Sequence, residues 1–298
     1  MFQETRFDFL KYRYFAVFFS VAMLAVFVGA YFYKTHTRGQ AFTYSIDFEG
    51  GTQVLFKFSR PVSSVQVQEI VEKAGWAAPA LREFSAQEVL VRVKEISTDS
   101  KGLSVKLLAV LQAALPDVQI EILQTEMVGS GVGKELRWNA TRAVLISIIA
   151  MLLYIALTFG SFAFAIGAVI ALFHDPIMIL GAFLLLEREI SLIFIAAILA
   201  VIGYSINDTI VIFSQIKKNI KKMQGVSLYD IVNLSINQTL RRTLLTSFAT
   251  ALTVLSMFLI GGEVLRDFSL ALLIGIVVGT YSSIYVASPV MMLFYKQK

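Results

Sequence analysis

Long apolar runs alternate with short polar segments over most of the chain, and one longer polar stretch interrupts them. The first apolar run, residues 15–33, contains no charged residue. Each run is near or above the roughly 20 residues that an α-helix needs to cross a bilayer. The later runs cover residues 143–159, 162–186, 190–216, 244–260 and 268–295. The pattern predicts six transmembrane helices.

The first run has the basic residues before it that a secretory signal also has. A signal, however, has an apolar core of only about 7–15 residues and ends in a small-residue cleavage site. Residues 15–33 are longer than that, and they end in the bulky sequence Tyr-Phe-Tyr before Lys34. We therefore expect an uncleaved first transmembrane helix.

The longer polar stretch, residues 34–134, has the pattern of a small domain. Its periodicity predicts, in order, a strand at 52–58, a helix at 63–74, strands at 80–84 and 88–94, a helix at 103–115 and a strand at 118–124. Ser63 can cap the first helix, Gly75 ends it, and Pro116 stops the second. The order β-α-β-β-α-β is the split βαβ, ferredoxin-like arrangement. The stretch has no nucleophile motif or phosphate loop, so we expect it to work through contacts.

Composition supports a membrane protein. Hydrophobic residues make up 57% of the chain, charged residues only 16%, and the mean hydropathy is +0.72; soluble domains have about 25% charged residues. The net charge of +5 does not indicate nucleic-acid binding, because the polar domain is nearly neutral. The absence of cysteine excludes disulfides and thiol chemistry, and two histidines make a multi-histidine metal site improbable. We expect no metal and no cofactor.

Basic residues gather beside one set of the short connections. Three stand in residues 1–14, six in the connection 217–243 and two in the tail 296–298, whereas the opposite short loops hold only Arg188 and Arg266. Basic residues in short loops mark the cytoplasmic side. We therefore expect a multi-pass membrane protein with both termini in the cytoplasm and the polar domain outside the cytoplasm.

The connection 217–243 carries a helix-start signal of its own. Ser227 stands three residues before Asp230 and is followed by apolar residues, which is typical of a capped helix. We expect a short amphipathic helix there. The lysines of residues 217–222, before this helix, are candidates to bind anionic lipid or to serve only as a solvated topological anchor.

Three ionisable residues lie away from the ends of the five later spans: His174 and Asp175 in the third span and Asp208 in the fourth. Each such residue costs roughly 2.5–3.5 kcal/mol on insertion scales, so it needs a reason to be there. Asp208 lies nine residues before Lys217, about 13 Å along a helix. Arg242 opens the fifth span on the same side of the membrane and can reach toward it. Asp208 and Arg242 are therefore candidates for a functional pair, or for an ion pair that only pins two helices together.

For His174 and Asp175 a structural role and a functional role remain open. Pro176 follows them directly, and a proline inside a helix frees a backbone carbonyl that polar side chains must satisfy. Gly275 and Gly279 form a G-x-x-x-G spacing in the last span, which lets two helices approach closely.

Five stretches, spread over the chain in order, resemble the SecF family of the bacterial SecD–SecF protein-export complex, within the resistance-nodulation-division superfamily. They are 46–52 (IDFEGGT), 171–175 (ALFHD), 203–211 (GYSINDTIV), 237–244 (NQTLRRTL) and 282–288 (SSIYVAS). The resemblance implies six spans with an extracytoplasmic domain after the first, a SecD partner, and cooperation with SecYEG and often YajC. It also implies that Asp208 and Arg242 occupy the family's intramembrane proton-pathway positions. Our own candidates for supporting polar residues are Asn207, His174 and Asp175.

The chain departs from the family pattern after the fourth span. The family commonly has an acidic-Arg-Ile-Arg-Glu-Asn run there, whereas this chain has Ser-Gln-Ile-Lys-Lys-Asn at residues 214–219. Ion pairing on the cytoplasmic face is therefore expected to differ, while the Asp208 position is unaffected.

The fold class we predict is a polytopic α-helical membrane protein with six spans and one small ferredoxin-like periplasmic domain. The expected function is proton-driven assistance of late protein export, in which the exported unfolded polypeptide is moved without an ATPase or other enzyme activity in this chain. One charge that crosses 100 mV supplies about 2.3 kcal/mol, and no Walker motif is present. The alternatives are half of a proton-coupled small-molecule exporter of the same superfamily, or a non-conducting membrane scaffold. We expect a SecD-type subunit to pack partly against Gly275 and Gly279.

Overall fold

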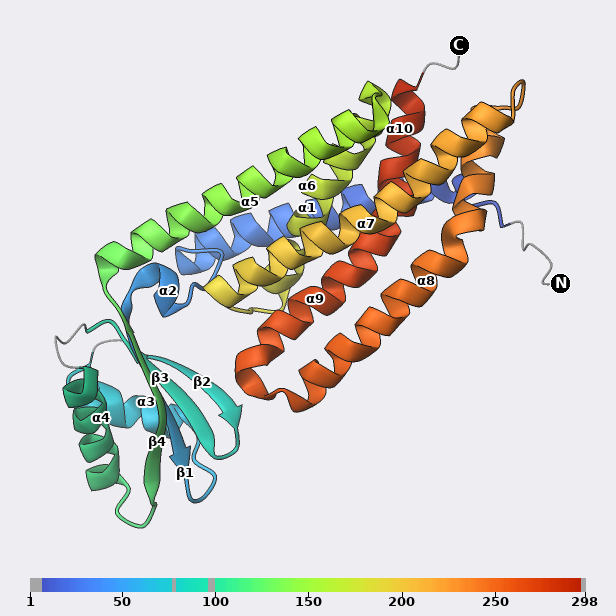
Figure 1. Cartoon of the computed structure of the whole chain (residues 1–298). Coiled ribbons are helices and arrows are strands. Elements are labelled where there is room, and N and C mark those ends of the chain that lie inside the picture. Colours follow the sequence, from blue (N-terminus) through green and yellow to red (C-terminus); the bar gives the residue numbers. More distant parts are fainter. Residues whose placement is uncertain (1–6, 77–78, 96–99, 296–298) are drawn as a thin grey trace. The chain divides into compact units, whose positions relative to one another are not determined.

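The computed structural model describes residues 7–76, 79–95 and 100–295. It contains two compact units (Figure 1). One is an α/β unit, Tyr44–Ala140, and the other, formed by Met1–Thr43 and Thr141–Lys298, is the helical membrane unit. The boundary after Ala140 falls within one long helix, α5 (Ser130–Phe159).

The α/β unit has the predicted order of strands and helices. Its elements are α2 (Ile46–Glu49), β1 (Gly51–Phe58), α3 (Ser64–Lys73), β2 (Ala80–Ser85), β3 (Glu88–Val93), α4 (Ser100–Ala114) and β4 (Ile120–Val128). The sheet order is β2-β3-β1-β4, and all neighbours are antiparallel. Each βαβ crossover therefore passes over one antiparallel strand, which is the split βαβ topology. The ferredoxin-like prediction is confirmed.

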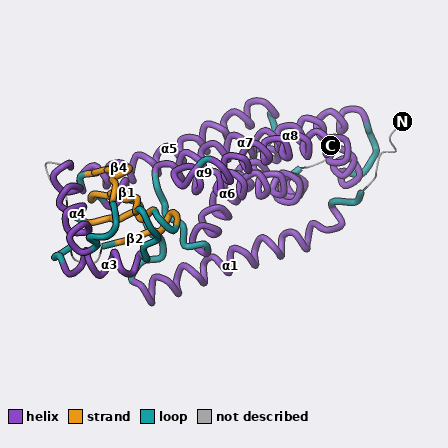
Figure 2. The backbone as a smooth tube through the Cα atoms, turned by 90° about the horizontal axis from the view of Figure 1, so that it is seen from below, coloured by secondary structure: helices purple, strands orange, loops and turns teal. Residues whose placement is uncertain are grey.

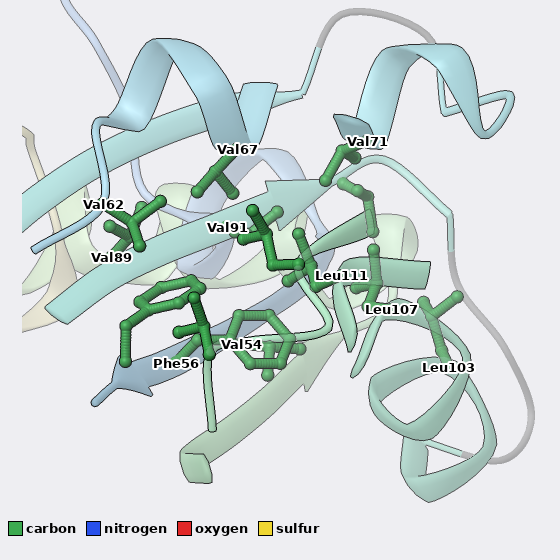
Figure 3. Packing of buried hydrophobic residues seen from close by; sticks show 14 residues of the cluster. Val54, Phe56, Val62, Val67, Val71, Val89, Val91, Leu103, Leu107 and Leu111 are labelled. Carbon is green, nitrogen blue, oxygen red and sulfur yellow. The ribbon is translucent and has the colours of Figure 1, made fainter. Parts of the chain in front are cut away.

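Alternation along the strands and a four-residue spacing along the helices build the core of this unit (Figure 3). Both helices place a row of apolar side chains toward the sheet, and these side chains are fully or almost fully buried. The core includes Val54 and Phe56 of β1, Val89 and Val91 of β3, Val67 and Val71 of α3, and Leu103, Leu107 and Leu111 of α4. Ser63 accepts a hydrogen bond from Val65 N at 3.3 Å and caps α3 as predicted.

Two consecutive glycines, Gly50 and Gly51, start β1. Their φ angles are +77° and +121°, in the region that favours glycine. A Cβ on Gly51 would lie 2.6 Å from the Val93 carbonyl oxygen. Only glycine allows β1 to approach β3 this closely at its first residue.

The membrane unit contains six helices that are long and apolar enough to cross a bilayer, as the hydropathy pattern predicted (Figures 1 and 2). They are α1 (Arg13–Arg38), α5 (Ser130–Phe159), α6 (Phe162–Leu185), α7 (Leu192–Lys222), α8 (Leu228–Ile260) and the last span, formed by α9 (Gly262–Ser282), a π-helical turn (Ser283–Ala287) and α10 (Ser288–Phe294). The connection 217–243 differs from expectation. Helix α7 continues to Lys222, and the helix that Ser227 caps runs on without a break as α8.

The prediction of a separate short helix is thus wrong, because the polar residues from 228 to 243 keep good helical backbone and simply form the first turns of α8. The N-terminal segment packs on these turns. Asn237 exchanges two hydrogen bonds with the backbone of Phe7, and Asn233 accepts one from Phe9 N. The tail 296–298 lies outside the described residues.

The six spans have similar hydropathy but unequal burial. Within the most apolar window, the buried share is 61% for α6, 50% for α7 and 44% for the last span, against 17% each for α1, α5 and α8. Helices α6, α7 and α9 therefore form the centre of the bundle. The polar side chains discussed below gather between these helices.

Candidate intramembrane site

Asp208 lies on the buried side of α7, with 2% of its surface exposed. Ser247 Oγ of α8 donates to Asp208 Oδ2 at 3.3 Å, and the same hydroxyl is 2.9 Å from Thr280 Oγ1 of α9. A carboxylate whose hydrogen-bond partner is a neutral hydroxyl is not held in an ion pair. It can therefore change its protonation state without breaking an ion pair.

Arg242 does not form the pinning ion pair that the sequence left open. Among the described residues, no ion pair within 4.0 Å joins Arg242 to Asp208, and Arg242 is exposed on α8. It stands five residues before Ser247 on the same helix, about 7.5 Å along the axis. A long arginine side chain can cover that distance. The structure places Arg242 near Asp208 without binding the two together.

Asp175 is the centre of a second polar cluster and is 1% exposed. Its Oδ2 accepts hydrogen bonds from Ser205 of α7 at 2.5 Å and from Ser282 of α9 at 2.9 Å. Its Oδ1 lies 3.0 Å from His174 Nδ1. Three helices thus meet at one carboxyl group.

His174 extends this cluster to the first span. Its Nε2 is 3.2 Å from Ser20 Oγ of α1. Ser20 Oγ is in turn 3.0 Å from the Tyr281 hydroxyl, which donates to the Ala16 carbonyl of α1 at 2.7 Å. The side chains of His174 and Asp175 bond to other side chains. These two side chains therefore do not bond to a backbone carbonyl that Pro176 leaves free.

A π-helical turn adjoins both clusters. It begins at Ser283, whose hydroxyl is 2.8 Å from Thr209 Oγ1, next to Asp208 in sequence, and Ser288 Oγ donates to the Ser283 carbonyl. The extra residue of a π turn within a helix is frequently found at functional sites. Here it follows directly after Ser282, the α9 partner of Asp175.

Asn207 lies on the opposite side of α7 from these clusters. It is exposed and makes no side-chain hydrogen bond among the described residues, and Gly203, one turn earlier, is exposed too. The structure therefore does not bring Asn207 to Asp175 or to the Asp208 side chain. It places Asn207 on a face that this chain leaves uncovered.

The glycines of the last span pack inside the chain. A Cβ on Gly275 would lie 2.2 Å from a Val201 methyl group, and one on Gly279 would lie 2.9 Å from Ser205 Cβ. Both glycines are needed for the close packing of α9 on α7. The expectation that they contact a partner subunit is wrong, because α7 already occupies that face.

Amide side chains hold the end of α7 where the family commonly has charged ones. Gln215 Nε2 donates to Gln238 Oε1 at 2.7 Å, and Asn219 Nδ2 donates to Gln238 Oε1 and to Ser235 Oγ, both at 2.9 Å. Neutral hydrogen bonds thus join α7 to α8 at this level. At residues 214–219, neutral amide hydrogen bonds thus stand where the family pattern has charged residues.

The sequence did not predict which hydroxyl groups bond within the two polar clusters. They are those of Ser20, Ser205, Ser247, Thr280, Tyr281 and Ser282. One signal was available, because Thr239, Thr243 and Ser247 recur every four residues and so lie on one face of α8. No cluster of three or more His, Asp or Glu that could hold a metal ion occurs in the part of the chain that the structure describes.

Comparison with known proteins identifies the family. Residues 109–297 match the family described as "Protein export membrane protein SecD/SecF, C-terminal", and residues 39–62 match the "SecD/SecF GG Motif", which includes Gly50 and Gly51. Protein translocase subunit SecF of Thermodesulfovibrio yellowstonii is 37% identical over 98% of this chain and 96% of its own length. The SecF subunit of Vibrio alginolyticus is 37% identical over 96% of this chain and 89% of its own.

Solved structures agree with these relatives. The crystal structure of SecDF from Thermus thermophilus, described as a translocon-associated membrane protein, matches with a TM-score of 0.87 and 35% identity over 98% of this chain. The match covers 39% of that longer polypeptide. SecDF in a super-membrane-facing form matches with a TM-score of 0.69 and 36% identity. With its six spans, its four-stranded α/β unit and these relatives, the chain belongs to the SecF family of protein translocase subunits.

Proposed function

We propose that this chain uses the proton-motive force to assist late stages of protein export, as one subunit of a Sec translocase accessory complex. The observation that carries the proposal is Asp208, a buried carboxyl group in the middle of the bundle whose hydrogen-bond partner, Ser247, is a neutral hydroxyl. Such a group can take up and release a proton, and Arg242 supplies a permanent positive charge nearby.

The free energy released by proton entry would act on the exported polypeptide through a conformational change of this chain. One proton that crosses 100 mV releases about 2.3 kcal/mol, enough to shift the population of two helix arrangements by more than tenfold. Protonation of Asp208 changes what α7 can bond to on α8 and α9. The α/β unit, which stands between the first two spans, would move with this cycle and pull on the unfolded polypeptide that emerges from SecYEG, with YajC as a further partner.

A SecD-type subunit is the proposed partner within the membrane. The matching family covers both SecD and SecF, and the SecDF polypeptide of Thermus thermophilus is much longer than this chain. Asn207 and Arg242 are exposed at the level of the spans, where lipid would be a poor environment for both. We propose that the face of α7 with Gly203 and Asn207 packs against the partner's helices.

The proposed orientation has both termini in the cytoplasm and the α/β unit in the periplasm of a bacterial inner membrane. It follows from the uneven distribution of basic residues in the short loops. The packing of the N-terminal segment on the first turns of α8 supports placing those two segments on the same side.

The decisive variant is Asp208→Asn, which keeps size and hydrogen bonding but cannot titrate. ATP-independent late export is measured in inner-membrane vesicles with and without a proton gradient. We expect the complex to assemble and gradient-stimulated export to be lost. Asp230→Asn, at the exposed start of α8, is the matched control and should export normally. Gradient-stimulated export by Asp208→Asn at the wild-type rate would exclude this mechanism.

A further inference from the structure

The hydrogens of the cluster around His174 can be assigned by counting donors. A carbonyl oxygen only accepts, so the single hydrogen of the Tyr281 hydroxyl points to Ala16 O. In the bond between Tyr281 and Ser20, Ser20 must therefore donate. Ser20 also has one hydrogen, so its oxygen accepts from His174, and the hydrogen in that bond is on His174 Nε2.

This assignment leaves one proton to account for between His174 and Asp175. A neutral imidazole carries a single ring hydrogen, and it is already on Nε2. The contact between Nδ1 and Asp175 Oδ1, 3.0 Å long and buried, needs a second hydrogen, because two lone pairs would repel. Asp175 Oδ2 accepts the hydroxyl hydrogen of Ser205. It also accepts that of Ser282, because this bond is 2.9 Å long whereas the Gly279 carbonyl lies 3.2 Å from the same hydroxyl, so the extra proton sits on the Oδ1 side.

We infer that His174 and Asp175 form a proton-binding pair that is loaded in this structure and that ties α1 to α9 through Ser20 and Tyr281. The pair is separate from Asp208, which makes no bond to either residue. The inference rests on the proposed function for its purpose, since a proton-driven cycle needs a proton-dependent contact between helices.

Release of the proton reverses one hydrogen bond and breaks another. One proton leaves the pair, and Asp175 becomes a carboxylate beside a neutral imidazole. The remaining ring hydrogen moves to Nδ1, where the bond to the carboxylate is charge-assisted and stronger. Nε2 then accepts from Ser20, so Ser20 can no longer donate to Tyr281. The Tyr281 hydrogen stays on Ala16 O, and the bond between Ser20 and Tyr281 is lost.

Loss of the bond between Ser20 and Tyr281 would weaken the attachment of the first span, α1, to α9. Helix α1 lies on the outside of the bundle and touches α6 where Phe27 packs on Gly181. The contacts of Ser20 and Ala16 with Tyr281 are its polar ties to α9. Helix α1 also leads, through residues 39–50, into the α/β unit. A proton on the pair thus sets how firmly the helix before that unit is held.

Few other titratable groups face the pair. On α9 there is Tyr281, with its ring centroid 6.2 Å from that of His174, and in the π-helical turn that follows there is Tyr285, which packs on Tyr281. On α7, Asp208 stands one turn beyond Ser205. Residues 14–33 of α1 contain no charged side chain. The protonation change is therefore assigned to His174 and Asp175 themselves.

Nitrogen NMR of the histidine rings tests the loaded state. The chain has two histidines, so His36→Gln leaves the His174 signals alone. With the full chain and its SecD-type partner in lipid nanodiscs, spectra are recorded at one acidic and one alkaline pH. We expect a protonated Nε2 in the loaded pair and a bare Nε2 once the proton is released. Asp208→Asn should leave this switch intact, which separates a failure of the proposed export mechanism from a failure of the pair. A His174 ring in one unchanged form throughout would overturn the inference.

The tie between α1 and α9 is tested with spin labels on Val17→Cys and Val277→Cys, two exposed positions on these helices in a chain without native cysteine. The wild-type distance distribution should broaden on proton release. Asp175→Asn can donate from its amide to Nδ1 and so mimics the loaded pair; it should stay narrow at both pH values. Tyr281→Phe keeps the ring but lacks the hydroxyl and should stay broad. A wild-type distribution that is the same at both pH values contradicts the proposed tie.

Discussion

Asp175 and Asp208, two buried carboxyl groups of the bundle, are joined by a single turn of α7, because Ser205, which donates to Asp175, precedes Asp208 by three residues. Asp175 has its donors on three helices, whereas Asp208 accepts from Ser247 of α8, whose hydroxyl in turn contacts Thr280 of α9. A rotation or shift of α7 therefore changes the surroundings of both carboxyl groups together. One turn of α7 thus belongs to both polar clusters.

Arg242→Met should keep the complex intact and abolish gradient-stimulated export. Because Arg242 makes no ion pair with Asp208 within the described residues, its removal leaves no buried charge unpaired, and assembly should be spared. Arg241→Met, the exposed neighbour, is the control and should export normally. Assembly and export in vesicles are both measured. Loss of assembly in Arg242→Met alone would favour a pinning role instead.

Gly275→Ala should destabilise the chain itself. The added Cβ would overlap the Val201 side chain, and overpacking a tight contact costs typically 1–3 kcal/mol. Gly29→Ala, on α1, has open space around its Cβ and should be harmless. Thermal unfolding of the purified chain in detergent compares the two. Equal melting temperatures would show that the α7–α9 contact tolerates a methyl group.

Gly203→Leu should leave the fold of this chain intact and weaken its binding to the partner subunit. No atom lies within 4 Å of a Cβ at this position, so the fold of the chain should survive the larger side chain. If the α7 face with Asn207 packs against a SecD-type subunit, recovery of that subunit in mild detergent should fall. Leu259→Ala, on an exposed part of α8 near its end, serves as the control. Full recovery of the partner with Gly203→Leu would place the interface elsewhere.

A cysteine at Ser85 should report the orientation. Ser85 is exposed at the end of β2, and the chain has no cysteine of its own. In cells whose outer membrane has been made permeable, a membrane-impermeant thiol reagent should label Ser85→Cys. A cysteine at Gln224, in the short turn between α7 and α8, should be labelled only after lysis of the inner membrane. The reverse pattern would invert the proposed topology.

The contact between the ends of α1 and α6 should weaken in acid. Glu187, just past α6, bonds to Lys34 at 3.1 Å and Arg38 at 2.9 Å, and hydrogen bonds from Lys34 and then Arg38 hold the pKa of its carboxyl below its usual value. A lowered pKa stabilises the fold above the carboxyl's usual pKa, and that stabilisation is lost as the pH falls through the lowered value. Melting temperatures of the chain and of Glu187→Gln should differ near neutral pH and converge in acid. A difference that does not depend on pH would exclude the ion pair as its cause.

The sequence by itself determined the six spans and the order of elements in the α/β unit. The physical reason is that both signals are local: a bilayer demands about 20 apolar residues in a row, and a two-sided strand or helix demands a fixed period. Ser63, Ser227 and Gly75 could likewise be assigned to helix ends, because a cap depends on residues within one turn. The continuous α8 could not, since its polar first turns read equally well as a separate helix.

Only the tertiary structure decided what the intramembrane residues touch. Asp208, His174 and Asp175 stand out in the sequence because charge is costly in lipid, but serines, threonines and a tyrosine carry no such signal. The structure showed that Gly275 and Gly279 face α7, that Asn207 faces outward, and that Ser20, 154 residues before His174, completes its hydrogen bonds. Which faces of six apolar helices meet depends on side-chain packing between distant segments, and hydropathy, which is similar all along these spans, does not encode it.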